Sequence, residues 1–340
     1  MSARQNIPSD WHWPTFVPSL CGMSDDRERL GLPKHFASFR FDERLPISFA
    51  RLRASSVEEL LCIVQAKNSL LEDRIAAGNL LAILGDPRIA DDTHSMIDIP
   101  GATVSIGLNS EDILKVLEEF DGLGLQSKWI EKECPKHVVK LKPFKMAKYL
   151  VTNSQYKVFL MDTMHPEIPS SWDFRRYPFE RANHPVYTIS PDSADAYAKW
   201  LKLKTGIPYR LPTEAEWEWA ASGPHNFQFP WGNTFDANLA NTAETGLLTS
   251  SPVGAFVGGE SSFGIADLAG NVEEYVSDIY KPYPNGHAVI DHLVELNGEY
   301  RVARGGSFAR FRDLARTKRR HGHNPKSAAY AMGFRLACDN

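Results

Sequence analysis

Residues 209–223 read YRLPTEAEWEWAASG, a stretch that predicts a short helix set into a loop-rich core. Thr213 and Glu216 have the spacing of a capping box, in which the two side chains bond free amides of the first helical turn. Trp217 and Trp219 then supply large apolar surface for a core that contains little regular structure. The stretch therefore predicts where one helix begins and what it buries.

Two similar signals lie upstream. Ser56 with Glu59, and Thr152 with Gln155, have the same capping-box spacing and predict two further helix starts. The segment AAGNLLAILGDPR (residues 76–88) ends in Gly85 and Pro87, which stop a helix. We therefore expect a helical hairpin near the N-terminus, packed on the main domain. Residues 1–54 show no sustained period and are expected to be irregular.

The sequence pattern changes from helical to strand-like near residue 96. The segment IDIPGATVSIG (97–107) alternates and contains glycine, and HVVKLKPFKMAKYLV (137–151) reads as a second strand region. A further helix is expected over residues 192–204. After Gly223 the chain loses simple periodicity, and so long an irregular stretch needs partners for its buried backbone groups. Bound cations are one way to supply such partners.

The composition limits the classes of function. The chain has 340 residues and a formal net charge of −4, which gives no general reason to expect a nucleic acid or an anionic membrane as partner. Its apolar runs are too short for a membrane helix, and its start lacks a secretory signal. The four cysteines are widely spaced and form no CxxC pair. These features predict a cytoplasmic protein with reduced thiols.

Eight segments, in this order, resemble the formylglycine-generating-enzyme (sulfatase-modifying-factor) family. They are MIDIPGATVSIG (96–107), ECPKHVVKLKPFKMAKYLVTNSQYKVFL (133–160), HPVYTISPDSADAYAKWL (184–201), YRLPTEAEWEWAASG (209–223), FPWGN (229–233), FGIADLAGNVEEYVSD (263–278), RVARGGSF (301–308) and MGFRLA (332–337). The resemblance implies an α+β fold, the loop-rich variant of the C-type-lectin fold found in that family. We expect a family-like domain over residues 96–340 and an N-terminal irregular and helical extension over residues 1–95.

The segment DLAGNVEE (267–274) is the candidate calcium site. Asp267 and Glu274 are hard carboxylate ligands, and the glycine between them suits a loop that curls around Ca²⁺. The resemblance implies calcium held by the side chains of Asp267 and Glu274 and by the carbonyls of Gly270 and Val272. The alternative is that Asp267 caps a turn and Glu274 is a solvated or paired acid.

The resemblance also implies a second calcium site. Asn238, with the Leu239 carbonyl, matches its first part. The family's aspartate position falls on Thr245, with Glu244 beside it. This departure puts the second site in doubt.

The family's catalytic cysteine pair is missing. Counting from Ser307 in the GGS motif, Arg310 stands at the first cysteine position and Ala315 at the second. Soft thiolates suit cuprous copper, whereas arginine is a permanent cation and cannot replace them. Formylglycine generation is therefore not expected of this chain.

The same region is rich in basic side chains. His321 and His323 have the HxH spacing that places two imidazoles on one face of a strand, where they could bind iron or copper; the alternative is a surface pair. Arg310 could clamp a carboxylate or phosphate. The cluster itself could instead be a solvated face with salt bridges. Its members are Arg301, Arg304, Arg310, Arg312, Arg316, Lys318, Arg319 and Arg320.

Two functions remain open from the sequence. The first is a metal- and oxygen-dependent oxidoreductase that modifies a small molecule or peptide, which can be anionic, with Ser307, Arg310, His321 and His323 lining the pocket. The second is a non-catalytic ligand-binding protein of C-type-lectin fold, such as a variable protein of a diversity-generating retroelement. In those proteins the variable stretch lies between GGS and the closing GFR motif, as residues 308–332 do here.

Overall fold

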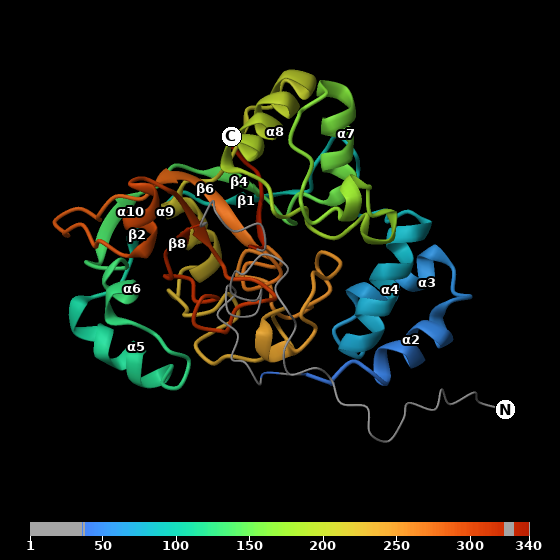
Figure 1. Ribbon diagram of the computed structural model, residues 1–340, viewed down its shortest axis with the longest axis horizontal. Helices are drawn as coiled ribbons and strands as arrows, with labels where there is room; N and C mark the ends of the chain where they lie inside the picture. The colour runs from blue at the N-terminus through green and yellow to red at the C-terminus, as the bar shows by residue number, and fades with distance from the viewer. Residues whose placement is uncertain (1–35, 37, 323–329, 340) are drawn as a thin grey trace.

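The structure is a computed structural model that describes residue 36 and residues 38–322 and 330–339. Within these residues, three helices come first: α2 (Arg44–Leu52), α3 (Val57–Gln65) and α4 (Leu71–Leu84). They pack on one another at one end of the molecule, drawn in blue at the right of Figure 1. Their shared core consists mainly of leucine, valine and alanine side chains.

The helix α2 corrects the expectation that residues 1–54 are irregular. Leu45, Phe49 and Leu52 lie on one face of α2 at a spacing of about one and two turns, and they pack against α3 and α4. The stretch is short and follows a proline-rich region, which hid this period. Residues 1–35 lie outside the described residues.

The three predicted capping boxes are confirmed. They start α3, the helix α7 (Asn153–Thr163) and the helix α9 (Glu214–Ser222), each with both reciprocal hydrogen bonds. The helix α4 ends at Leu84, and Gly85 follows with φ +99°, a conformation that glycine adopts without strain. The helix expected over 192–204 is α8 (Pro191–Thr205), which has a serine cap at Ser190.

The remaining helices are short. The α-helices are α5 (Ile113–Glu119), α6 (Ser127–Glu131) and α10 (His292–Asn297). The 3₁₀ turns are η1 (Ser110–Asp112), η2 (Asp173–Arg175), η3 (Phe179–Arg181) and η4 (Ala243–Thr245). From residue 223 to residue 272 η4 is the longest regular helical or strand element, as the sequence predicts for this loop-rich region.

Three small sheets organise the domain. The first has the order β1 (Met96–Ile99), β4 (Phe144–Ala147), β10 (Ala337–Asp339), β5 (Tyr209–Arg210). The second pairs β2 (Thr103–Ile106) with β3 (His137–Lys140). The third has the order β8 (His321–Gly322), β7 (Arg301–Arg304), β6 (Glu273–Ile279), β9 (Met332–Phe334), in which β6 and β9 run parallel. This mixture of short helices, small sheets and long loops is the predicted α+β, C-type-lectin-like fold.

The N-terminal helices contact the rest of the domain through buried polar groups. His184 Nε2 lies 2.7 Å from Asn79 Oδ1 of α4, and Asn183 Nδ2 donates to the carbonyl of Gly78. The first strand begins at Met96. The division of the chain at residues 95 and 96 remains a proposal.

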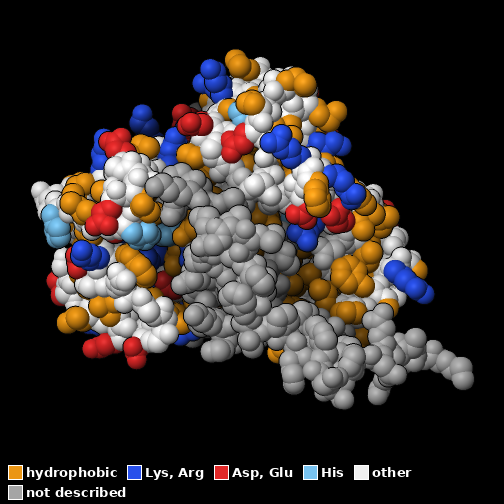
Figure 2. Space-filling model, viewed as in Figure 1, with side chains coloured by type: hydrophobic (Ala, Val, Ile, Leu, Met, Phe, Trp, Pro, Cys, Tyr) orange, Lys and Arg blue, Asp and Glu red, His pale blue; other side chains and the backbone are white. Residues whose placement is uncertain are grey.

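The surface carries both signs of charge. On the face shown in Figure 2, Lys and Arg side chains are interspersed with Asp and Glu side chains. Hydrophobic side chains gather at the right of that face, where Figure 1 places α2–α4. Among the described residues, none of the helices has the length and apolar character needed to cross a bilayer.

Candidate functional site

The candidate site lies on the third sheet, where β6, β7 and β8 run side by side (Figure 1). On β7, Ala303 pairs with His321 of β8 and with Tyr275 of β6. Glu273 is two residues from Tyr275 and therefore lies on the same face of the sheet. Because the alanine between them is small, the side chains of His321 and Glu273 meet across β7: Nδ1 of His321 lies 2.6 Å from Oε2 of Glu273.

This histidine–carboxylate pair is buried. Glu273 is 1% exposed and His321 is 8% exposed. Burial lowers the pKa of His321 to about 4, assisted by the positive charges of Arg310 and Arg319, so the imidazole is neutral at pH 7. Burial alone would raise the pKa of Glu273, but it is lowered, because His321, Arg310 and Arg319 surround the carboxylate. An ionised carboxylate only accepts, so Nδ1 carries the proton and Nε2 keeps its lone pair.

An arginine and a tyrosine complete the site. Arg310 Nε lies 3.7 Å from Oε1 of Glu273. The guanidinium of Arg310 stands 4.6 Å above the ring centroid of Tyr330, and the His321 ring stacks near the same tyrosine. Arg310, which the sequence predicts as an anion-binding group, is therefore beside the pair.

The GGS motif brings Arg310 to this place. The amide of Arg310 donates to the carbonyl of Ser307, which closes a turn directly after β7. Gly306 has φ +67°, and a Cβ on it would lie 3.0 Å from Ala315 N, so only glycine lets the returning chain pass so closely. Ser307 is 1% exposed, at the base of this turn.

The other predicted site residues have different fates. His323 lies outside the described residues, so the HxH pair remains a prediction. Ala315, at the second cysteine position, is fully buried in an apolar cluster with Phe120 and Phe229. It takes part in packing.

The site offers a redox metal one good ligand atom. A histidine that donates Nδ1–H to a carboxylate is oriented as metal-bound histidines are, with Nε2 available. However, the described residues contain no group of three His, Cys, Asp or Glu side chains placed to hold a metal. Arg310 and Arg319 also oppose a second positive charge beside His321. The described residues therefore fit iron or copper only as a single-histidine anchor.

Most of the predicted basic cluster is structural. Its arginines are largely buried, which rules out a solvated face, and they pair with carboxylates far away in sequence. Arg304 pairs with Glu214 and Glu218, Arg316 with Glu133, Arg320 with Glu214, Arg301 with Asp195 and Arg312 with Glu244.

The two carboxylates predicted to bind calcium differ in their partners: Glu274 is in an ion pair with Arg335, whereas Asp267 accepts from a backbone amide. Both oxygens of Glu274 bind Arg335, at 2.5 and 2.7 Å, and Oε2 also accepts from the Trp217 indole at 2.9 Å. Asp267 is buried and accepts from the amide of Gly254, and burial raises its pKa to about 6. Gly270 has φ +83° and pairs with Asn241. Asp267 fits a cation ligand. Glu274 could bind Ca²⁺ only if its carboxylate contacted Ca²⁺ and Arg335 at the same time.

The second predicted calcium position contains a guanidinium. Arg40 Nη2 donates to Asn238 Oδ1 at 2.5 Å, and Arg40 Nη1 donates to the carbonyl of Thr245 at 3.4 Å. The Thr245 hydroxyl donates to the carbonyls of Ala237 and Ala240, and Glu244 pairs with Arg312. The carboxylate expected of the site is absent and a cation from the N-terminal region contacts its asparagine, so Asn238 does not fit a calcium ligand.

Sequence reasoning missed Glu273 as a member of the site. It treated the NVEE stretch as a calcium loop and singled out Glu274. On a strand, two consecutive side chains point to opposite faces of the sheet. Glu273 and Glu274 therefore could not both point into the same site. That alternation is the signal that would have found Glu273.

Comparison with known proteins agrees with the fold. Residues 85–340 match the family model described as "Sulfatase-modifying factor enzyme 1-like domain". The chain is 30% identical to a formylglycine-generating enzyme of Thermomonospora curvata, over 72% of this chain and 93% of the relative. It is 34% identical to a formylglycine-generating enzyme of Mus musculus and 29% identical to a hercynine oxygenase of Mycolicibacterium thermoresistibile. These matches cover 52% and 62% of the chain, and it spans only about half of either relative (48% and 54%).

Two solved structures have the same fold. PvdO from Pseudomonas aeruginosa superposes with a TM-score of 0.55 and 26% identity, over 74% of this chain and 96% of PvdO. Variable protein 1 of Treponema denticola gives the same TM-score with 21% identity, over 73% of this chain and 95% of that protein, which shows the fold alone. The family match covers most of the chain and includes all three sheets. The chain therefore belongs to the sulfatase-modifying factor enzyme 1-like domain family, to which the formylglycine-generating enzymes are similar in sequence.

Proposed function

We propose that the protein is an oxygen-dependent oxidoreductase that modifies a small molecule or a peptide and does not generate formylglycine. The observation that carries this proposal is the buried Glu273–His321 pair beside Arg310, at the place where the family's cysteine pair is expected. A buried neutral imidazole held by a carboxylate is the arrangement of a general base. The oxygenase among its relatives supports the reaction class.

Each residue has a distinct task in this proposal. Nε2 of His321 takes a proton from the substrate group that is oxidised by O₂. Glu273 fixes the tautomer of His321 and stabilises the imidazolium that forms. Arg310 binds an anionic group of the substrate, since a guanidinium matches a carboxylate or phosphate with two hydrogen bonds. With Arg310 and Ala315 in place of cysteines, the chain lacks the thiolates that would bind copper.

A redox metal belongs to the proposal as a cofactor, but Nε2 of His321 is the base here and is not counted among the metal's ligands. When bound, iron or copper would supply the activation of O₂. Free thiols at Cys62, Cys134 and Cys338 are consistent with a reducing compartment, and we propose a cytoplasmic location on that ground.

The test combines metal analysis with oxygen uptake. Wild-type protein and His321→Ala are each reconstituted with Fe²⁺ or Cu⁺, and the metal that each retains after desalting is measured by mass spectrometry. Oxygen uptake with hercynine or with cysteine-containing peptides should fall at least about 100-fold in the same variant. His225→Ala, which changes a histidine outside the site, is the control. Equal oxygen uptake in His321→Ala and the wild type would refute the proposal.

We also propose a structural calcium at Asp267. Calcium in millimolar excess is expected to raise the melting temperature by several degrees relative to EGTA, since saturation at about 100 times Kd adds about 2.7 kcal/mol. Asp267→Asn should abolish this increase.

The calcium effect should depend on pH. Without calcium, the raised pKa of Asp267 means that the folded state holds a proton between pH 3.8 and about 6, so this group's stabilisation is lost as pH rises through 6. Calcium must displace that proton. The increase in melting temperature should therefore be larger at pH 8 than at pH 5, and a calcium effect that is the same at both values would argue against Asp267 as the ligand.

A further inference from the structure

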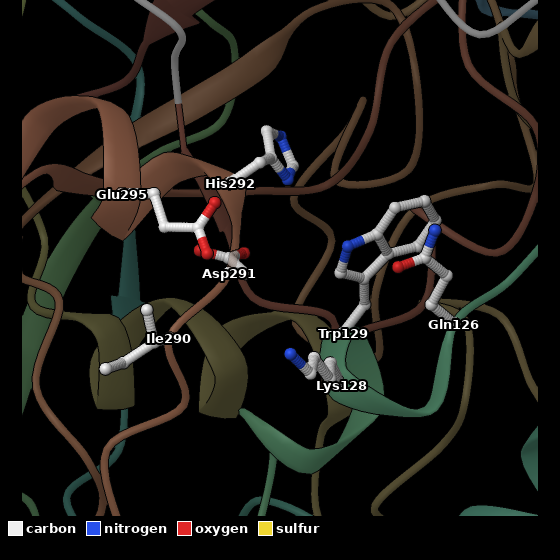
Figure 3. A pocket seen from close by; sticks show the side chains of 7 residues that line it. All are labelled: Gln126, Lys128, Trp129, Ile290, Asp291, His292 and Glu295. Carbon is white, nitrogen blue, oxygen red and sulfur yellow. The ribbon is translucent and has the colours of Figure 1, made fainter.

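A cavity of about 480 Å³ lies between α6 and α10, apart from the residues discussed so far. Small-molecule sites in proteins usually measure about 300–1,000 Å³, so its size suits a compact ligand. Figure 3 shows its walls: Asp291 and Glu295 on one side, Lys128 and Trp129 on the other, with His292 above. Gln126 and Ile290 complete the lining.

The charges of the cavity are only partly neutralised. Asp291 is buried and bound to Lys132 Nζ at 2.6 Å, and its other oxygen caps α10. Glu295 and Lys128 are exposed, and within the described part of the chain neither side chain has a hydrogen bond or ion pair. The cavity therefore presents one available carboxylate and one available ammonium on opposite walls.

Two aromatic rings also line the cavity. Trp129 and His292 meet edge to face, with ring centroids 6.4 Å apart. Partial burial lowers the pKa of His292; the charge of Asp291 opposes this shift, and Lys132, Arg310 and Arg319 add to it. The rings offer apolar surface to the uncharged part of a ligand.

Arg319 connects the cavity to the Glu273–His321 pair. It donates to the Trp129 carbonyl at 3.0 Å, and its guanidinium lies 5.8 Å from the Trp129 ring centroid. Its charge also acts on both Glu273 and His321. A ligand against Trp129 would therefore be one buried arginine away from the proposed base.

We propose that this cavity binds a free α-amino acid, or the zwitterionic end of a molecule that contains one, as a subsite of the proposed reaction centre. Glu295 binds the ammonium, Lys128 binds the carboxylate, and Trp129 with His292 packs against the side chain. The proposal rests on the proposed function only for the subsite's connection with the reaction. Binding itself can be tested without it.

Isothermal titration calorimetry of the full chain with each of the twenty free L-amino acids tests the proposal. We expect saturable one-to-one binding of at least one of them. The amide of that amino acid, which lacks the carboxylate, and its N-acetyl derivative, which lacks the ammonium, should each bind at least about tenfold more weakly, since a charged hydrogen bond contributes about 1.5–3 kcal/mol.

The variants assign the two charges. Lys128→Gln should weaken binding of the amino acid about tenfold and leave binding of its amide unchanged. Glu295→Gln should leave binding of the N-acetyl derivative unchanged. Trp129→Leu should abolish binding. Lys115→Gln and Glu299→Gln, which change exposed charges outside the cavity, are the matched controls, and melting temperatures confirm that every variant folds.

Two results would overturn the subsite: no amino acid binds at 10 mM, or binding persists unchanged in Trp129→Leu, Lys128→Gln and Glu295→Gln. Titration of His321→Ala separates the subsite from the reaction. Amino-acid binding that survives in His321→Ala supports the subsite even if no oxygen uptake is ever found. Oxygen uptake that depends on His321 and is unchanged in Trp129→Leu would sustain the proposed function and reject the cavity's connection with the reaction.

Discussion

Replacing Arg335 with methionine is expected to lower the free energy of unfolding by about 3–5 kcal/mol, because removing one partner of a buried ion pair leaves the other charge uncompensated. Arg335 and Glu274 are both 0% exposed. Besides its two bonds to Glu274, Arg335 donates to the carbonyls of Ala147 and Ala266, so it joins β4, the loop before β6 and β6 itself. For a protein of this size, the melting temperature should fall by about 5–10 °C in differential scanning calorimetry.

A surface ion pair of similar geometry provides the control. Arg210 binds Glu216 with two hydrogen bonds, at 2.7 and 2.8 Å, but its side chain is 31% exposed. Arg210→Met should cost about 1 kcal/mol, since loss of the partly exposed guanidinium opens the Glu216 carboxylate to water and leaves its hydrogen bond from the Thr213 amide in place. The double variant Arg335→Met/Glu274→Gln should recover part of the loss, because it removes the stranded charge. Equal melting temperatures for Arg335→Met and Arg210→Met would contradict the argument.

The helix starts could be predicted because their signals are local. A capping box needs only residues three apart, and all three boxes quoted from the sequence form both bonds. The helix α2 was missed because its start lacks a side-chain cap and its apolar period lasts only nine residues. Local signals thus predicted helices with caps and overlooked one that is held by packing.

The role of the arginines could not be predicted for the opposite reason. A run such as ARTKRRHG looks solvated when read alone, but its partners lie elsewhere in the chain: Glu133 is 183 residues from Arg316, and Glu214 is 106 residues from Arg320. Folding brings these acids to the arginines, and only the tertiary structure shows which cations are already neutralised. Arg310 is distinguished by its place beside Glu273 and Tyr330.

The candidate site was half predictable. Ser307 and Arg310 follow from counting along the GGS segment, and His321 follows from its HxH spacing with His323. Glu273 did not, because its neighbour Glu274 had a ready assignment as a calcium ligand. The strand β6 resolves the two acids: Glu274 faces Trp217 and Arg335, and Glu273 faces His321. The cavity between α6 and α10 had no signal in the sequence, since its walls are two short helices that are more than 150 residues apart.

Glu273→Gln is expected to lower kcat for oxygen uptake by about 10²–10⁴-fold, the usual contribution of general acid–base catalysis. Glutamine has nearly the same shape, so it can still accept from Nδ1 of His321. It cannot stabilise the imidazolium that forms when Nε2 takes a proton. Because Glu273 contacts His321 and lies behind it, KM should change by no more than about threefold, which separates a positioning residue from one that binds substrate.

The carboxylate, rather than the shape of the side chain, is the feature that this prediction tests. Glu273→Asp keeps the charge and should retain more activity than Glu273→Gln, although the shorter side chain moves it away from His321. In the wild type, ¹⁵N NMR of labelled histidine should show the His321 tautomer with the proton on Nδ1. Glu299→Gln, an exposed acid outside the site, should leave kcat unchanged. If Glu273→Gln retained full activity, or if the proton were found on Nε2, His321 could not act as the base, and the site would fit a ligand-binding protein better than an enzyme.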